Sequence, residues 1–319
     1  MTKVLILGGT AWLSGLIASR WIDTGAQVTC LARGTHPVPE GAALVRADRD
    51  DADPYGELHG EWDEIVDVSR HVHHASGAVA ALGARAARWT YVSSVSVYAE
   101  EATPGTDESA DTLAPAQDGD EYEYGAQKVA SEAAVRTLGE RARIVRPGLI
   151  VGPGDPSDRF GYWAAAFDRA ADGPVLIPRV EGRTTQVIDV DDLVSFVVDG
   201  HSSDAVNAVG DVHELGRVLD AFRSATAHSG EVVVADDQWL ETQGVEFWAG
   251  DRSLPLWLPV DMGGFTTRSN SAYRAAGGTL TPLEKTIERI VDDERARGVN
   301  RERRAGLTRD QEMALLTAL

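Results

Sequence analysis

The stretch EYEYGAQKVASE contains a tyrosine and a lysine at a spacing that suits acid–base chemistry. Tyr124 and Lys128 are four residues apart, so on a helix they lie on one face. A nearby ammonium favours phenolate and lowers the pKa of a tyrosine. Such a tyrosine can exchange a proton with a carbonyl or alcohol oxygen. Tyr122 lacks this partner, because Ala126 lies four residues beyond it. Tyr124 and Lys128 are therefore the expected acid/base pair.

A hydroxyl group is expected close to this pair. The segment YVSSVSVY, residues 91–98, begins as an apolar strand and ends in serines. The carboxyl end of a strand in an α/β sheet is where ligands bind. Ser94 is the candidate for a hydroxyl that hydrogen-bonds the reacting oxygen.

The elements that must position these residues alternate between strands and helices. Strands are expected at 3–7, 28–31, 43–46, 64–68, 89–93 and 142–146, and helices at 13–24, 75–87 and 124–138. This order predicts an α/β fold with a doubly wound parallel (Rossmann) sheet. Residues 1–152 and 184–212 are expected to form the dinucleotide-binding domain. Residues 153–183 and 213–319 are expected to form a smaller, discontinuous C-terminal substrate lobe, and the acidic stretch 100–123 a loop.

The turn after the first strand, GGTAWLSG, is a candidate phosphate site. A dinucleotide fingerprint places three glycines at three-residue intervals. The better register here is Gly8, Ala11 and Ser14, since the alternative starting at Gly9 puts Trp12 in the middle. Thr10 offers a hydroxyl, and a following helix presents free N–H groups to phosphate. The expected cofactor contacts in this turn are Gly8, Thr10, Ala11, Trp12 and Leu13.

The second strand ends in LARG, which favours NADP over NAD. A NAD site normally has an acidic side chain near this position for the ribose hydroxyls. Arg33 stands there instead, and a guanidinium suits the additional phosphate of NADP. The alternative for Arg33 is a plain surface charge. Asp48, after the third strand, is expected to accept a hydrogen bond from the adenine amino group.

In their order, these motifs resemble those of an extended short-chain dehydrogenase/reductase of the NAD-dependent epimerase/dehydratase type. The supporting stretches are LILGGTAWLSG, ADRDD, VSSVSVY, YGAQKVASE, RPGLIVGPGD and VIDVDDL. The resemblance implies that Ser94 is the catalytic serine, Tyr124 the acid/base and Lys128 a ligand of the nicotinamide ribose. It places Pro147 beside the nicotinamide and implies a homodimer. The turn and the NAVG segment look closest to atypical reductase-like members.

Two departures from the family pattern bear on the substrate. Sugar dehydratases have acidic residues after the catalytic serine, whereas this chain has Val95 and Ser96. Nucleotide-sugar epimerases have an arginine shortly before VDD, where this chain has Thr185, with Arg183 displaced by two residues. The sequence therefore supports neither dehydration nor a UDP-sugar substrate.

The substrate contacts suggested by the sequence are few. They are Val95, Arg159, Tyr162 and Trp163. For the last three the alternative is packing between the lobes. Trp248 and Trp257 are expected in the core, and a place in the cleft would indicate a partly aromatic substrate. His71, His73 and His74 match no standard zinc spacing, so no metal is expected.

The composition restricts the partners. The 319 residues have a formal net charge of -20, which disfavours nucleic acid. The single cysteine, Cys30, suits a reducing compartment. No signal peptide and no apolar run of membrane-spanning length is apparent, so a cytoplasmic protein with no membrane partner is expected.

Three functions are compatible with these observations. The favoured one is an NADP(H)-dependent oxidoreductase that acts on a carbonyl or secondary alcohol of a small substrate. The second is an epimerase that holds NAD(P) tightly and oxidises its substrate transiently. The third is a non-catalytic dinucleotide-binding sensor or scaffold.

Overall fold

The central element of the computed structural model is a parallel sheet, and the structure describes residues 1–117, 119–202 and 204–319. Within these ranges seven strands are joined in the order β10-β6-β5-β4-β1-β2-β3. All six pairings are parallel. The strands are β1 (Lys3–Leu7), β2 (Gln27–Ala32), β3 (Ala43–Arg46), β4 (Glu64–Asp67), β5 (Trp89–Val92), β6 (Ala142–Pro147) and β10 (Ala205–Ala208). The expected doubly wound α/β fold is confirmed.

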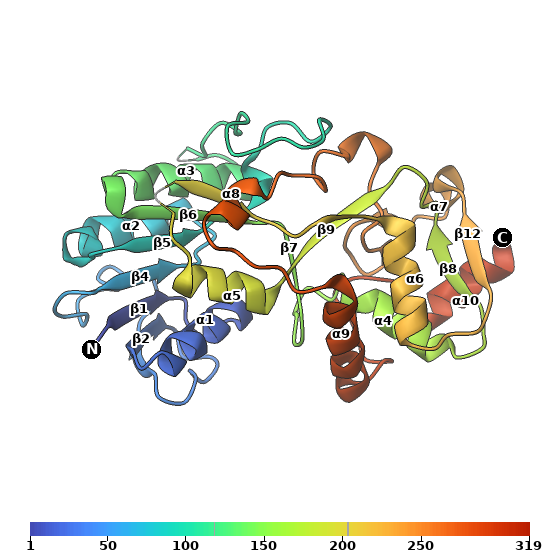
Figure 1. Cartoon of the computed structure of the whole chain (residues 1–319), viewed down its shortest axis with the longest axis horizontal. Helices are drawn as coiled ribbons and strands as arrows, with labels where there is room; N and C mark the ends of the chain where they lie inside the picture. Colours follow the sequence, from blue (N-terminus) through green and yellow to red (C-terminus); the bar gives the residue numbers. More distant parts are fainter. Residues whose placement is uncertain (118, 203) are drawn as a thin grey trace.

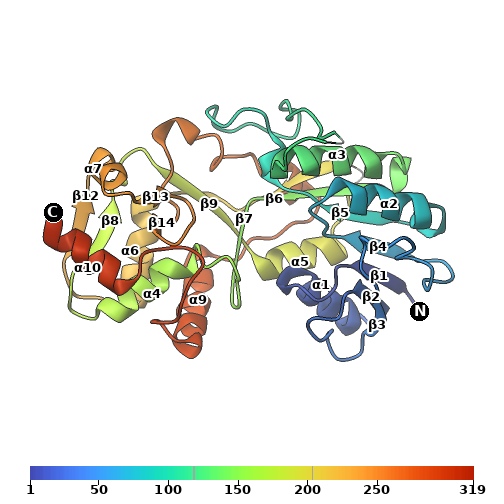
Figure 2. The same ribbon diagram turned by 180° about the vertical axis from the view of Figure 1, so that it is seen from behind.

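Helices cover both faces of this sheet. Helices α2 (Val72–Leu82) and α3 (Tyr124–Arg136) pack together on one face, and α1 (Trp12–Asp23) and α5 (Val190–Asp199) on the other (Figures 1 and 2). Helix α2 begins and ends earlier than the sequence predicts. It stops at Leu82 because Gly83 starts a short 3₁₀ turn, where a Cβ would lie 2.7 Å from Leu138.

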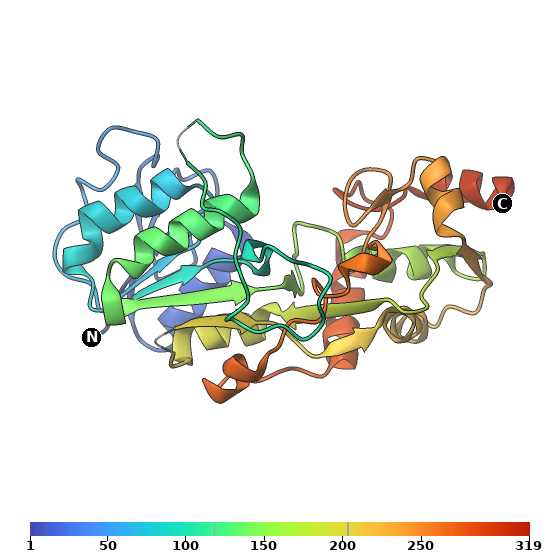
Figure 3. The same cartoon turned by 90° about the horizontal axis from the view of Figure 1, so that it is seen from above.

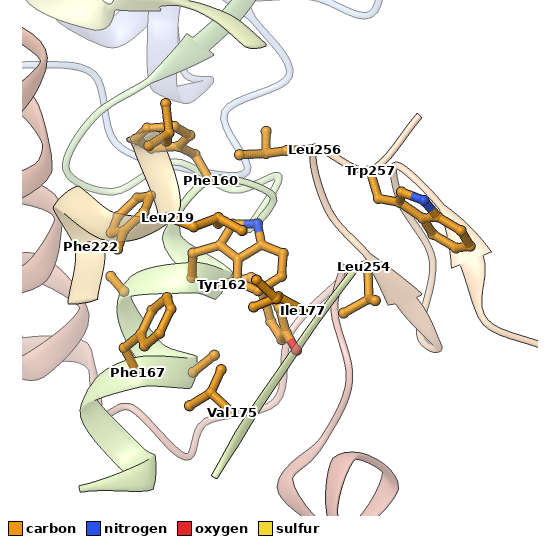
Figure 4. Packing of buried hydrophobic residues seen from close by; sticks show 14 of the residues in the cluster. Phe160, Tyr162, Phe167, Val175, Ile177, Leu219, Phe222, Leu254, Leu256 and Trp257 are labelled. Carbon is orange, nitrogen blue, oxygen red and sulfur yellow. The ribbon is translucent and has the colours of Figure 1, made fainter. Parts of the chain in front are cut away.

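A second group of elements forms a lobe beside the sheet (Figure 1). Its helices are α4 (Gly161–Ala170), α6 (Leu215–Ala225), α7 (Asp237–Thr242), α9 (Leu283–Arg297) and α10 (Arg309–Ala318). Its short strands are β8 (Val175–Pro178) with β12 (Val232–Ala235), and β13 (Glu246–Phe247) with β14 (Ser253–Leu254). Aromatic side chains fill the core of this lobe, among them Phe160, Tyr162, Phe167 and Trp257 (Figure 4).

The two groups are connected by a small sheet and by a returning segment. Strands β7 (Leu149–Val151), β9 (Thr184–Asp189) and β11 (Val212–Glu214) form a separate sheet, so β9 is not in the large one. Helix α8 (Ser271–Ala275) packs beside the large sheet, next to β10. The ring of its Tyr273 packs on the ring of Phe196 in α5, with the centroids 4.6 Å apart. The expected division of the chain into two parts remains a proposal. The sequence assigns α8 to the substrate lobe, whereas in the structure it packs on the elements of the large sheet.

The acidic segment after β5 lies along the junction of the two groups (Figure 3). In its described residues, the stretch 99–123 contains no helix or strand. The buried Arg268 fastens it, since its guanidinium donates to the Glu100 carbonyl oxygen at 2.6 Å and to the Thr106 hydroxyl. Among all described residues, no helix combines the length and hydropathy that crossing a bilayer requires.

Candidate active site

The turn between β1 and α1 has the geometry of a phosphate cradle. Gly8 has a φ of +91°, which favours glycine. A Cβ on Gly9 would lie 2.5 Å from the Cys30 sulfur, so this residue must also be small. Helix α1 has no side-chain hydrogen bond at its N-cap, Ala11. Its first N–H groups therefore remain available to an anion, as a bound pyrophosphate requires.

The residue that replaces the third glycine has a role of its own. Ser14 is fully buried, and its hydroxyl donates to the Gly8 carbonyl oxygen at 2.6 Å. This bond holds the turn against the first turn of the helix. Trp12 connects the same turn to the lobe, because its indole N–H donates to the Pro153 carbonyl oxygen at 2.9 Å.

Two arginines stand where the second and third strands end. Arg33 is exposed and forms a long ion pair with Asp48, at 4.0 Å. Arg46 is the register partner of Ala32, and its guanidinium lies 3.3 Å from where a Cβ on Gly34 would stand. Among described residues no carboxylate is within 4.0 Å of Arg46. The sequence prediction missed Arg46, although its place at the end of β3, beside β2, was a usable signal.

The candidate catalytic serine and tyrosine meet at the end of β5. Ser94 is the N-cap of a 3₁₀ turn at Val95–Val97, and its Oγ accepts from the Ser96 N–H at 3.1 Å. Its hydroxyl donates to the Ser96 hydroxyl at 3.0 Å and is close enough to the Tyr124 phenol to lower the pKa of that group. Gly125 permits this approach, because a Cβ there would overlap the Ser96 carbonyl oxygen. Helix α3 thus begins in contact with the serine turn.

Two main-chain carbonyl groups hold the side chain of Lys128 in place. Its buried Nζ donates to the carbonyl oxygens of Ser69 and Val92, each at 2.7 Å. It lies 5.8 Å from the centroid of the Tyr124 ring. These two carbonyl groups lie at the ends of the neighbouring strands β4 and β5, so the sheet fixes the position of the Lys128 amine near the Tyr124 ring.

The charges around Tyr124 differ from the expectation. Burial raises the pKa of Tyr124 above its usual value, opposed by Arg70, by the Ser94 hydrogen bond and by Arg159. Burial also lowers the pKa of Lys128 to about 7, although Asp67 opposes this. Lys128 is not among the groups that lower the pKa of Tyr124, whereas Arg70 and Arg159 are. The raised pKa of Tyr124 favours the protonated phenol, which is the form that can donate a proton. The sequence prediction missed Arg70.

A buried polar network supports the serine segment. The Ser93 hydroxyl donates to Glu132 at 2.6 Å, and Arg146 binds both oxygens of the same carboxylate, at 2.8 and 2.7 Å. Arg146 also donates to the Tyr98 hydroxyl, which donates to Asn207 at 2.5 Å. This network joins β6, α3 and β10 and fixes α3 relative to the serines. None of these residues was singled out from the sequence.

The lobe contributes Arg159 to the site. Its guanidinium lies 4.9 Å from the centroid of the Trp248 ring and close enough to Tyr124 to affect the pKa of the phenol. Among described residues no carboxylate lies within 4.0 Å of it, although Asp155 is a charged neighbour. Trp248 is half-buried and packs between Arg159 and Phe265, with the Phe265 ring centroid 5.4 Å from its own.

The other suggested substrate residues lie elsewhere. Tyr162 is fully buried in the lobe core (Figure 4). Trp163 is also fully buried, and its indole N–H donates to the Pro255 carbonyl oxygen at 2.8 Å. Their placement favours the packing alternative, because eight of the ten residues of α4 are buried. Val95 is buried next to Ser94. Pro147 ends β6 and is buried.

Comparison with known proteins shows the family and the fold of this chain. Residues 4–201 match the model of the NAD dependent epimerase/dehydratase family. A relative from Kitasatospora kifunensis, dTDP-6-deoxy-L-talose 4-dehydrogenase (NAD(P)(+)), is 28% identical over 253 residues, or 70% of each chain. The UDP-glucuronic acid 4-epimerase of Bacillus cereus, solved with NAD, superposes with a TM-score of 0.69 at 13% identity and covers 92% of this chain and 99% of its own. A putative epimerase from Burkholderia cenocepacia gives 0.69 at 19% identity, covering 92% and 98%.

The fold and the site together define an NAD(P)-dependent enzyme of the extended short-chain dehydrogenase/reductase type. The chain belongs to the NAD dependent epimerase/dehydratase family.

Proposed function

We propose that this protein is an NADP(H)-dependent oxidoreductase that interconverts a carbonyl and a secondary alcohol of a small, partly aromatic substrate. The observation that carries the proposal is the group of Ser94, Tyr124 and Lys128 at the ends of β4 and β5. Lys128 is held there by two carbonyl oxygens at 2.7 Å. Arg159, which is close enough to Tyr124 to affect its pKa, and Trp248, whose ring lies 4.9 Å from the Arg159 guanidinium, would supply a cation and an aromatic surface for the substrate.

The chain's own residues account for the proton in reduction. The nicotinamide supplies or accepts the hydride. Tyr124 donates its phenolic proton to the substrate oxygen, and Ser94 hydrogen-bonds that oxygen as charge develops. Lys128 would bind the ribose of the cofactor, and the charges of Arg70 and Arg159 would stabilise the phenolate that remains after transfer. Pro147, the buried end of β6, would border the nicotinamide.

Net consumption of reduced cofactor tests this function. We expect the purified protein to oxidise NADPH in the presence of a carbonyl panel, measured by the loss of nicotinamide absorbance. The panel includes aromatic ketones, and dTDP-6-deoxy-L-talose with NADP⁺ as an alcohol, since a relative carries that name. An epimerase would interconvert sugars with no net change in NADPH and would co-purify with the dinucleotide. Sugar interconversion without a net change in NADPH would favour the epimerase alternative, which the names of the structural neighbours support.

A UDP-sugar is not the substrate that the lobe favours. The guanidinium of Arg183 is buried and donates to the Leu258 carbonyl oxygen at 2.9 Å and to Asp237. It is therefore already committed within the lobe. A homodimer and a cytoplasmic location remain predictions.

The preference for NADPH is proposed from Arg33 and Arg46 at the ends of β2 and β3. We expect Arg33→Ala to raise the Kd for NADPH roughly 10- to 100-fold, as loss of a charge-assisted hydrogen bond to phosphate does. The Kd for NADH should stay within about twofold, because NADH has no such phosphate. Fluorescence titration of both cofactors measures the ratio. Equal losses for both would contradict the assignment of Arg33 to the additional phosphate.

A further inference from the structure

Three side-chain atoms that could bind a metal ion lie close together at the surface. They come from two segments that are distant in the sequence. Asp50 lies in the loop after β3, and His73 and His74 lie in the first turn of α2. The Nε2 atoms of both imidazoles lie 2.9 and 2.8 Å from the same oxygen, Oδ1 of Asp50. All three ligating atoms are within 4.8 Å of one another.

This arrangement has the size and chemistry of a metal site. Zinc binds imidazole nitrogen and carboxylate oxygen at about 2.0–2.2 Å, so ligand atoms around a tetrahedral ion are roughly 3.3 Å apart. Imidazole with carboxylate suits zinc and its neighbours in the first transition row. The side chains of Asp50 and His73 are 66% and 59% exposed, so an ion from solution can reach them and water can complete its coordination.

The neighbouring charges leave Asp50 available. Arg49, the adjacent residue, is turned inward and pairs with both oxygens of Asp67 at 3.0 and 3.2 Å. The ring of His71 contacts the rings of His73, His74 and Tyr122 at 5.5, 5.6 and 5.1 Å, but its nitrogen atoms are not part of the three-ligand group. Among the described residues, the three-ligand group therefore has no arginine or lysine bound to its carboxylate.

We propose that Asp50, His73 and His74 form a site for a divalent transition-metal ion such as zinc. The ion would connect the loop after β3 to the start of α2. The spacing of the histidines in the sequence indicates no metal, because the third ligand comes from 23 residues earlier in the chain. This proposal does not depend on the reaction that the enzyme performs.

Calorimetry with zinc chloride on the untagged, full-length chain tests the site. We expect one equivalent to bind with a Kd on the order of micromolar, and cobalt to give the intense visible bands of a tetrahedral ion. The double variant His73→Ala/His74→Ala, and separately Asp50→Asn, should each weaken binding about tenfold or more. His59→Ala, an exposed histidine elsewhere, and His71→Ala are the matched controls and should bind as the parent does.

The outcomes are decisive because the ligands are near the surface and their removal should leave folding intact, which circular dichroism checks. Absence of stoichiometric zinc binding in the parent would overturn the proposal. Unchanged affinity in the double variant would overturn it too. A tenfold loss in His71→Ala or His59→Ala would overturn the assignment of the ligands.

Discussion

Tyr124→Phe should reduce turnover by about 10³-fold or more while the Kd for NADPH changes by less than about threefold. The substitution removes the phenolic proton, and general acid catalysis of this kind contributes roughly 10²- to 10⁴-fold. The ring stays, so its packing and the cofactor cradle are preserved. Steady-state kinetics with the best carbonyl substrate, together with fluorescence titration of NADPH, separate the two effects.

The matched control is Tyr122→Phe. Tyr122 is two residues away and 52% exposed, so losing its hydroxyl should leave kcat within about twofold. The assigned role of Tyr124 fails if the Tyr124→Phe variant keeps more than a tenth of the parent kcat. A comparable loss in both variants would point to damage at the start of α3 instead.

Arg49→Ala should lower the free energy of unfolding by about 3–5 kcal/mol, the usual cost of breaking a buried ion pair. The carboxylate of Asp67 is fully buried, and two guanidinium nitrogens of Arg49 donate to its oxygens at 3.0 and 3.2 Å. Without Arg49 the carboxylate is left buried and unpaired. Urea unfolding at neutral pH measures the loss. Arg46→Ala, which removes an exposed arginine at the end of β3, should cost less than about 0.5 kcal/mol.

The same variant should show a distinct pH dependence. Burial raises the pKa of Asp67, but the charge and hydrogen bonds of Arg49 outweigh this and hold it below its usual value. In the parent this carboxylate contributes stability above an unfolded pKa of about 3.9 and loses it as the pH falls. In Arg49→Ala the folded pKa lies above the unfolded one, so stability falls as the pH rises. The difference between the two proteins should therefore widen between about pH 4 and pH 7, and a constant difference would contradict this assignment.

The sequence predicts the elements well where a local pattern specifies them. The apolar runs of β1 and β5 and the four-residue spacing of Tyr124 and Lys128 depend only on neighbours in the chain. The strand order then follows from parallel crossovers, so the end of β5 and the start of α3 meet. The turn that follows Ser94 therefore contacts the start of α3, and the catalytic roles of Ser94 and Tyr124 stay predictions.

What the sequence could not predict depends on long-range contacts. Eight of the ten residues of α4 are buried, so the helical period does not show that Tyr162 and Trp163 lie in the lobe core. Burial, rather than the spacing of charges, determines the direction of the Lys128 pKa shift. Glu132 and Arg146 are 14 residues apart, and the packing of α3 on β6 brings them together. Asp50 and the histidines meet in the same way.

The indole of Trp12 joins the glycine turn to the first loop of the lobe, and Arg159 returns from that lobe to the phenol. Neither half therefore carries a complete site, and transplanting one of them onto a homologue would separate these partners. A functional chimera must exchange both sides of the Trp12–Pro153 junction together. Directed evolution of a new substrate specificity would then vary residues of the sheet domain and of the lobe together, rather than exchange one of the two alone.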